Sequence, residues 1–419
     1  MQAPSPFVRF VGASGLTNFA DGVATIVWAW MATLLTRDPL LISLMPVALR
    51  LPWFVFALPA GIVADRVDRK RLIQAMDVLR ALAFGGAACA VFVATPLPPA
   101  PDGGTSLPWL YALLLVAALG VGTAEVFRDN AAQTMLPAIV PHAALERANG
   151  RLWSVELVGN ELLGPALGAL LIAASVWSPF ALNAGAFAAA ALLLTGIRGD
   201  FRPPPRAAAP WRDELAEGMR FLRGSPILMA LALITGVWNL LWMMVTVALI
   251  LHAQENLGMS APAYGLLLAA GAVGGIAGSL IAERVIARLG QAGTTQWMLV
   301  ASAVAFALIP LAPNPWVLAA ILIPFQASGL IWNTVSVSFR QRVTPDAILG
   351  RLNSVYRLLA WGMMPVGLLL SGWMIGAAES VVDRGTALTV PFYASAFGAA
   401  LLTLLGWRPL ARGFALAQR

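Results

Sequence analysis

Twelve long apolar stretches constrain this chain more than any other feature of its sequence. A membrane-spanning helix needs about 20 mostly apolar residues, and each stretch approaches or exceeds that length. The predicted spans are 8–35, 40–64, 72–95, 108–135, 149–176, 178–196, 226–252, 262–283, 294–312, 315–339, 347–377 and 386–407. Hydrophobic residues make up 59% of the chain and charged residues only 11%, a balance that would leave large apolar patches on a soluble domain. The sequence therefore predicts an all-α membrane protein with twelve transmembrane helices.

The basic residues are distributed unevenly between the two sets of loops. With the N-terminus inside, 21 of the 27 fall in cytoplasmic segments, and only Arg37 and Arg384 lie outside. The positive-inside rule then places both termini in the cytoplasm, as expected for a bacterial inner membrane protein. The first stretch is too long for a signal peptide and is expected to be retained. The net charge of +7 is thus a topology signal, and no nucleic-acid partner is expected.

Cysteine and histidine are scarce. The chain has one cysteine, Cys89, and two distant histidines, His142 and His252. We therefore expect no disulfide, no metal site and no cofactor. Neither histidine lies beside a serine or cysteine motif, so a membrane-embedded enzyme is disfavoured.

A hydrophilic segment divides the chain into two halves of six spans each. We expect a six-helix bundle over 1–197, a cytoplasmic linker over 198–225 and a second bundle over 226–419. Within the linker, Trp211, Leu215, Met219 and Leu222 recur at helical spacing, which predicts an amphipathic helix on the inner membrane surface.

The halves repeat the same loop chemistry. Asp65-Arg66 after the second span corresponds to Glu283-Arg284 after the eighth. The segment 141–149 after the fourth span matches 345–353 after the tenth at its proline, leucine, arginine and asparagine. Two pseudo-symmetric six-helix bundles around a central cavity follow from this repeat.

The loop 61–71 resembles the signature that major facilitator superfamily transporters carry between their second and third helices. The matching residues are Gly61, Asp65, Arg66, Arg69, Lys70 and Arg71. In that family the loop is a cytoplasmic latch on the eleventh helix, so the resemblance implies a contact near 346–351. The alternative is that these basic residues only set topology.

Further motifs narrow this resemblance. Asp21-Gly22, Asp68-Arg69, the segment 77–80 and the segment 141–149 are similar to the branch that holds enterobactin exporters and macrolide efflux proteins. The fifth span also resembles the glycine-proline motif of antiporters, with one extra intervening residue. Its residues are Gly159, Gly164, Pro165 and Gly168. We expect a stiff, kinked seam between the halves, although small residues are common in membrane helices generally.

Acidic residues inside the spans are confined to the first half. Each ionisable group at the centre of a membrane helix costs roughly 2.5–3.5 kcal/mol on insertion scales, so it needs a partner or a function. Asp21 and Glu161 are the candidates for proton coupling, with Arg50 as the predicted counter-ion of Asp21. If that pair were permanent, Asp21 would stay ionised and carry no proton. The predicted inner gate network comprises Asp77, Arg80, Glu125, Arg128, Asp129, Glu156, Arg147 and Arg351.

Polar and aromatic residues at mid-span are the candidates for the substrate cavity. Asn18, Thr25 and Trp28 share a helical face with Asp21. The others are Trp238, Asn239, Trp242, Gln326, Asn333, Arg357 and Trp361. Broad aromatic faces suit amphiphilic or cationic ligands, although several of the tryptophans could equally face lipid.

These observations predict a monomeric, proton-driven exporter in the lipid bilayer. It would move a small amphiphilic compound (a drug, a macrolide or a siderophore-like molecule) by alternating access. The alternative is a proton-coupled importer of a small organic solute or metal chelate. A non-transporting sensor would be expected to lose the cavity acids or to append a signalling domain.

Overall fold

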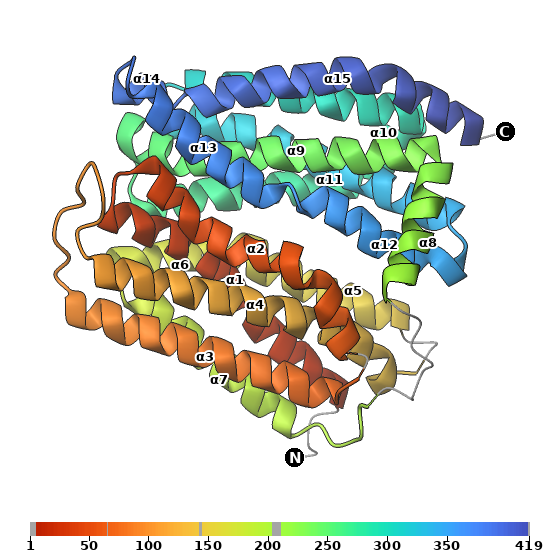
Figure 1. The fold of residues 1–419 in the computed structure, drawn as a ribbon, viewed down its shortest axis with the longest axis horizontal. Helices are drawn as coiled ribbons and strands as arrows, with labels where there is room; N and C mark the ends of the chain where they lie inside the picture. Colours follow the sequence, from red (N-terminus) through yellow and green to blue (C-terminus); the bar gives the residue numbers. More distant parts are fainter. Residues whose placement is uncertain (1–5, 65, 142–144, 203–210, 418–419) are drawn as a thin grey trace. The chain divides into compact units, whose positions relative to one another are not determined.

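The computed structural model describes residues 6–64, 66–141, 145–202 and 211–417, and these form helices without any β-strand (Figure 1). The predicted all-helical class is confirmed for this part of the chain. Two compact units are present. The first comprises Met1–Ala207 with Ser260–Ala269, and the second comprises Ala208–Met259 with Ala270–Arg419.

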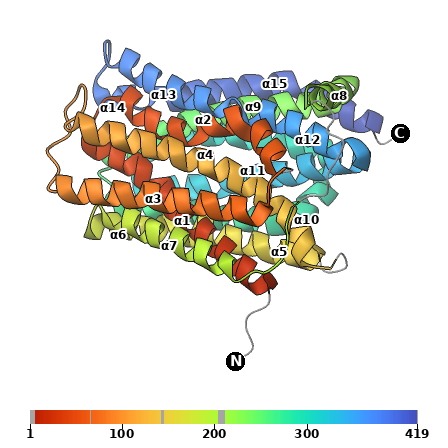
Figure 2. The ribbon, with the colours of Figure 1, turned by 60° about the horizontal axis from the view of Figure 1, so that its bottom comes forward.

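The first unit contains the first six spans. Its helices are α1 (Pro6–Leu35), α2 (Pro39–Ala64), α3 (Arg69–Ala94), α4 (Pro108–Ile139), α5 (Leu145–Glu156), the π-helical segment η2 (Leu157–Leu163), α6 (Gly164–Ala174) and α7 (Ser178–Thr195). The segments α5, η2 and α6 together make the fifth span. Helix α1 packs against both α6 and α7 within this unit (Figure 2).

The second unit contains the linker helix and the remaining spans, except that Ser260–Ala269, at the start of the eighth span, belongs to the first unit. Its elements are α8 (Trp211–Gly224), α9 (Pro226–Leu251), the π-helical segment η3 (His252–Asn256), α10 (Ala261–Leu308), the short η4 (Ile309–Leu311), α11 (Pro315–Val343), α12 (Asp346–Trp361), α13 (Met364–Ala378), α14 (Arg384–Ala387) and α15 (Val390–Ala417). The eleventh predicted span is thus built from α12 and α13.

Among the described residues, eleven helices are long and apolar enough to cross a membrane. The difference from twelve arises at α10, which contains both the eighth and the ninth predicted spans. Gly290 interrupts α10 with φ 69°, a left-handed conformation that glycine adopts at little steric cost. The two predicted spans therefore lie on either side of this break.

Polar residues in the short connections start the helices. Asp68 accepts a hydrogen bond from the backbone nitrogen of Arg71 at 2.9 Å at the start of α3. Asn314 accepts from the backbone nitrogens of Trp316 and Val317, both at 3.0 Å, at the start of α11. Such side chains satisfy backbone donors that the first helical turn leaves unpaired.

Helix α8 forms where the amphipathic pattern predicts it, but its apolar face is not turned toward lipid. Leu222 is fully buried in the core of the second unit. A Cβ atom on Gly218 would lie 2.7 Å from the carbonyl oxygen of Arg351, so the glycine allows α8 to approach α12 closely. Glu217 also pairs with Arg351. The apolar face of α8 therefore packs on α12, and its position at the membrane surface stays a prediction.

Candidate functional site

One ion pair of the first unit joins α1 to α3. Arg80 donates a hydrogen bond from Nη2 to Oδ1 of Asp21. The Arg80 side chain is 0% exposed, whereas the Asp21 side chain is 22% exposed. The guanidinium carbon of Arg80 also lies 3.9 Å from the centre of the Phe187 ring on α7. The prediction that Arg50 is the partner of Asp21 is wrong, since Arg50 is an exposed side chain and the buried α3 position supplies the counter-ion.

A second charge cluster lies on α3 one helical turn before Arg80. Asp77 is fully buried, and its Oδ1 is 3.5 Å from Nε of Arg128 on α4. Arg128 also contacts Asp129, with 3.2 Å between Nη1 and Oδ1. Three members of the predicted inner gate network thus do come together, between α3 and α4.

Arg50 has other acidic neighbours. It interacts electrostatically with Glu125 of α4 and with Glu161 of η2. Glu125 also interacts electrostatically with Asp21 and Arg80, so it connects the two sets of charges. Arg50 therefore interacts with two acids to which the sequence analysis gave different roles.

The remaining predicted gate residues lie apart from this cluster. Arg147 and Glu156 are exposed on α5, although Glu156 still interacts electrostatically with Asp129 and Arg128. Arg351 belongs to the second unit and pairs with Glu217 of α8, so its assignment to the same network is not supported. Glu217 is a partner that the sequence analysis overlooked.

The structure places the predicted cavity residues of α1 in different surroundings. Thr25 is exposed and donates to the backbone oxygen of Asp21 at 3.1 Å. Asn18 is half-buried and donates to the backbone oxygen of Ser14 at 2.8 Å. Trp28, in contrast, is 1% exposed. Its ring lies 5.3 Å from that of Phe84 and 5.1 Å from that of Phe180, so Trp28 packs inside the bundle and does not line a cavity face.

The glycine-proline motif packs against α1 at the residue beside Asp21. A Cβ atom on Gly22 would lie 2.6 Å from the backbone oxygens of Gly159 and Asn160, and one on Gly164 would lie 2.5 Å from Cα of Gly22. A Cβ atom on Gly168 would lie 2.9 Å from the backbone oxygen of Val23. These glycines therefore form a seam with α1 within the first unit. A Cβ atom on Gly265 of the eighth span would lie 3.0 Å from the backbone oxygen of Pro165, so part of the C-terminal half of the sequence also meets this motif.

The extra residue in this motif has a structural counterpart. Residues Leu157–Leu163 form a π-helical segment, in which each turn holds one more residue than an α-helical turn. Pro165 follows directly in the first turn of α6, where its missing N–H is tolerated. The π-helical segment thus accommodates the extra residue, and the glycines still face α1.

The predicted latch residues make contacts inside the first unit. Lys70 donates from Nζ to the backbone oxygens of Ile197 at 2.6 Å and Thr195 at 3.4 Å, which caps the end of α7 with a positive charge. Arg69 donates to the backbone oxygen of Thr134 at 2.8 Å. Gly61 is half-buried, the side chains of Arg66 and Arg71 are exposed, and Asp65 lies outside the described residues. A latch contact with the eleventh span stays a prediction.

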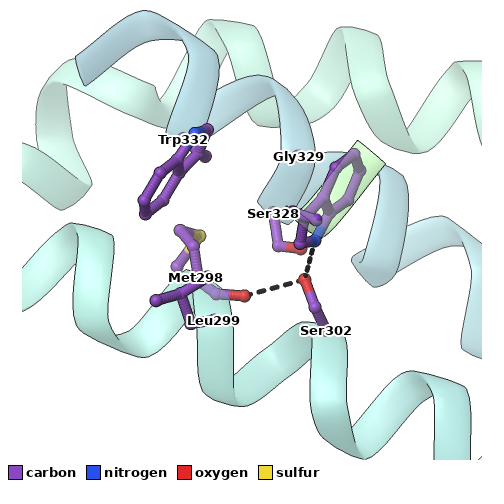
Figure 3. A pocket seen from close by; sticks show the side chains of 7 residues that line it. Met298, Leu299, Ser302, Ser328, Gly329 and Trp332 are labelled. Atoms are coloured by element: carbon purple, nitrogen blue, oxygen red, sulfur yellow. Dashed lines mark hydrogen bonds between the residues drawn. The ribbon is translucent and has the colours of Figure 1, made fainter. Parts of the chain in front are cut away.

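Two of the predicted cavity tryptophans lie in the aromatic interior of the second unit. The ring centre of Trp242 lies 4.8 Å from that of Phe325, and the ring centre of Trp238 lies 6.0 Å from that of Phe325. Trp238 donates from Nε1 to Oγ of Ser302 at 2.9 Å. A small cavity beside it is lined by Met298, Leu299, Ser302, Ser328, Gly329 and Trp332 (Figure 3). It has room for about one water molecule, so it is too small for a drug-sized substrate.

Asn239 is also structural. It is 7% exposed and donates from Nδ2 to the backbone oxygen of Ala360 at 2.8 Å, which ties α9 to α12. The prediction that Asn239 lines a cavity is therefore wrong, because its amide is used by the main chain of a packed helix.

The other second-unit candidates keep accessible side chains. Asn333, Arg357 and Trp361 are exposed, and Gln326 is half-buried. The guanidinium carbon of Arg357 lies 5.1 Å from the centre of the Trp361 ring, within the range of a cation-π interaction. These four residues remain candidates for substrate contact.

Sequence reasoning missed two polar groups. Asn183 of α7 is fully buried inside the first unit. In the second unit, the Tyr356 hydroxyl lies 2.8 Å from Oγ of Ser336 and 3.1 Å from Oγ1 of Thr235, while Arg340 stacks 3.9 Å above the Tyr356 ring. A lone asparagine in an otherwise apolar span was the available signal for Asn183.

Comparison with known proteins places this arrangement in a family. The sequence profile described as transmembrane secretion effector matches residues 6–407. The chain belongs to this family. It is a multi-pass membrane transporter of the major facilitator superfamily and not an enzyme.

Relatives and solved structures agree with this assignment. The chain is 25% identical to the multidrug efflux pump Tap of Mycolicibacterium fortuitum over 394 residues, covering 89% of this chain and 90% of the pump. It is 29% identical to the enterobactin exporter EntS of Shigella boydii over 360 residues, covering 84% and 78%.

The fold matches that of solved transporters. A bacterial homologue of the iron transporter ferroportin in an inward-facing state superposes with a TM-score of 0.73 at 16% identity, covering 97% of this chain and 98% of the other. The nucleoside transporter NupG also gives a TM-score of 0.73, at 15% identity, covering 97% and 99%. These likenesses concern the fold alone.

Proposed function

We propose that this protein is a proton-driven exporter of small amphiphilic compounds that carry a positive charge. The observation that carries the proposal is the excess of acid in the first unit. Residues that lie at least five positions inside the ends of its predicted spans include six acids and three arginines. The acids are Asp21, Asp77, Glu125, Asp129, Glu156 and Glu161, and the arginines are Arg50, Arg80 and Arg128. An uncompensated acid inside a membrane protein needs a proton or a cationic ligand.

Asp21 is the group best suited to exchange a proton for substrate. Its side chain keeps 22% of its surface exposed, while Arg80 behind it has none. A proton from outside would bind the carboxylate and neutralise it, which weakens the attraction for a cationic substrate. Loss of that proton to the cytoplasm restores the negative charge. Proton and cation thus compete for the same carboxylate, which is the linkage that antiport requires.

The relatives support export. Two curated relatives are named as a multidrug efflux pump and as an enterobactin exporter. The acid excess favours a cation-bearing drug-like molecule over an anionic catecholate, because an anion would add repulsion to the first unit.

Inside-out membrane vesicles test direction and coupling together. The intact protein should take up a fluorescent organic cation into these vesicles only when a proton gradient is imposed. Asp21→Asn should abolish the gradient-driven component, because the amide cannot bind a proton. Asp102→Asn, in the exposed loop before α4, is the matched control and should transport normally.

The competing function is import by proton symport. One structural neighbour is named a nucleoside transporter and another a bacterial metal transporter, so the fold alone is compatible with either. In right-side-out vesicles, an importer would accumulate solute with the same proton gradient. Accumulation of that kind, without uptake into inside-out vesicles, would exclude the exporter.

We further propose that the protein acts as a monomer in the bacterial inner membrane with both termini in the cytoplasm. The support is the distribution of basic residues between the loops. A reporter that works only in the cytoplasm should be active when it is fused to either terminus. A fusion active in the periplasm at either end would contradict this orientation.

A further inference from the structure

Several helices of the first unit bury polar atoms that have no hydrogen-bond partner among the described residues. Both carboxylate oxygens of Asp77 and two nitrogens of Arg128 are among them, and these two side chains form an ion pair with each other. The others include Nε1 of Trp28 on α1, Nε and Nη1 of Arg80 on α3, and both amide atoms of Asn183 on α7. Trp28 is 1% exposed, and Arg80 and Asn183 are 0% exposed. An unpaired buried polar group destabilises the fold, so three such residues together indicate that a ligand binds them.

The three residues surround one aromatic cluster. The Arg80 guanidinium carbon lies 3.9 Å from the centre of the Phe187 ring, and the Trp28 ring lies 5.1 Å from that of Phe180. Asn183 stands three residues after Phe180 and four before Phe187 on α7, so its side chain shares their helical face. The unpaired atoms of Trp28, Arg80 and Asn183 therefore belong to one interior region.

The chemistry of these atoms selects the ligand. The indole, the guanidinium and the Asn183 nitrogen donate hydrogen bonds, while only Oδ1 of Asn183 accepts. A ligand must therefore accept several hydrogen bonds and donate one, which water does. An anion is a poorer match because Asp21 already balances the charge of Arg80. Buried water molecules of this kind typically make about three hydrogen bonds each.

The region leads from Asp21 toward the predicted outer face. Trp28 follows Asp21 by seven residues, about 10 Å along α1 at 1.5 Å per residue. Asn183 lies in the second turn of α7, which starts at Ser178, at the end predicted to be extracellular. The unpaired atoms of Trp28 and Asn183 thus extend outward from the ion pair of Asp21 and Arg80.

We propose that Trp28, Asn183 and Arg80 bind a short chain of water molecules that carries protons from outside to Asp21. The proposal rests on the proton-coupled export proposed above. A hydronium ion at the outer end gives up one proton, each water passes one proton on, and a carboxylate oxygen of Asp21 accepts the last. No other covalent bond changes. Charged groups that act on Asp21 from the packed helices are Arg80 of α3, Arg128, Asp129 and Glu125 of α4, Asp77 of α3 and Glu156 of α5.

Radiolytic footprinting of the full-length protein in nanodiscs tests the water chain directly. Hydroxyl radicals formed from bound water label adjacent side chains. Trp28 and Phe187 should be labelled several-fold more than Phe306, which is equally buried in the second unit. Asn183→Leu should reduce that labelling. Labelling of Trp28 no greater than that of Phe306 would overturn the proposal.

Transport assays with and without a proton gradient separate proton delivery from substrate binding. Asn183→Leu should slow proton-driven transport about tenfold, the effect of losing one or two hydrogen bonds to water, while substrate counterflow at equal pH stays unchanged. Trp28→Phe replaces the indole with a smaller phenyl ring, which removes the N–H but keeps an aromatic side chain, and it should act in the same direction if Asn183→Leu fails to fold. Normal proton-driven transport by both variants would overturn the proposal. Proton-driven transport that survives Asp21→Asn would instead refute the coupling role of Asp21, and the footprint would still test the water.

Discussion

Arg80 is entirely buried against the carboxylate of Asp21, whose own side chain retains 22% exposure. The pair is therefore asymmetric, with a cation fixed in the interior and an anion that reaches the surface of the first unit. This geometry makes Arg80 a permanent charge of the bundle, and it leaves protonation or substrate binding to Asp21.

Removing Arg80 should be more harmful than removing Arg50. Truncating one member of a buried ion pair costs about 3–5 kcal/mol, because the other charge stays behind unpaired. Arg80→Met should lower the melting temperature of the detergent-solubilised protein markedly, whereas Arg50→Met, at an exposed position, should lower it little. Thermal unfolding followed by tryptophan fluorescence measures both.

A double variant provides the control for that prediction. Adding Asp21→Asn to Arg80→Met removes the uncompensated carboxylate and should recover part of the lost stability. A double variant less stable than Arg80→Met alone would show that the two side chains do not act as a pair.

Gly22 should tolerate no side chain. A Cβ atom there would lie 2.6 Å from two backbone oxygens of η2, and backbone cannot move as a flexible side chain can. Overpacking of this kind costs about 1–3 kcal/mol, so Gly22→Ala should reduce both the melting temperature and the transport rate. Gly86→Ala is the matched control, since nothing lies within 4 Å of its Cβ position. Equal melting temperatures for the two variants would contradict the tight seam.

The fold was predictable because its signals are local and repeated, but the pairing of charges was not. Arg50 and Arg80 both lie near the middle of their spans, and periodicity within a helix does not reveal which neighbouring helix it faces. For the same reason the sequence placed Trp28 beside Asp21 on a cavity face, although its ring packs between Phe84 and Phe180. Asn239 was misassigned because a main-chain partner, the carbonyl of Ala360, leaves no trace in sequence.

The docking of α8 on α12 should depend on Gly218. Its Cβ position is 2.7 Å from the backbone oxygen of Arg351, so Gly218→Val should force the two helices apart and expose the linker. Limited proteolysis should then cleave near α8 faster than in the unmodified protein. Arg220→Gln, on the exposed side of the same helix, should leave the cleavage rate unchanged. Faster cleavage in both variants would indicate general destabilisation of α8.

The acids around Arg50 should favour substrates that carry a positive charge. Glu161 is exposed and its electrostatic partner is Arg50, which also serves Glu125. With one arginine between two acids, a negative charge is left for a cationic substrate, and an exposed attraction of this kind contributes on the order of 1 kcal/mol. Glu161→Gln should therefore raise the KM for an organic cation several-fold and leave the KM for a neutral analogue of the same size unchanged. Competition transport assays with the matched pair of compounds measure this difference. An equal rise for both compounds would mean that Glu161 supports the shape of the site and does not select for charge.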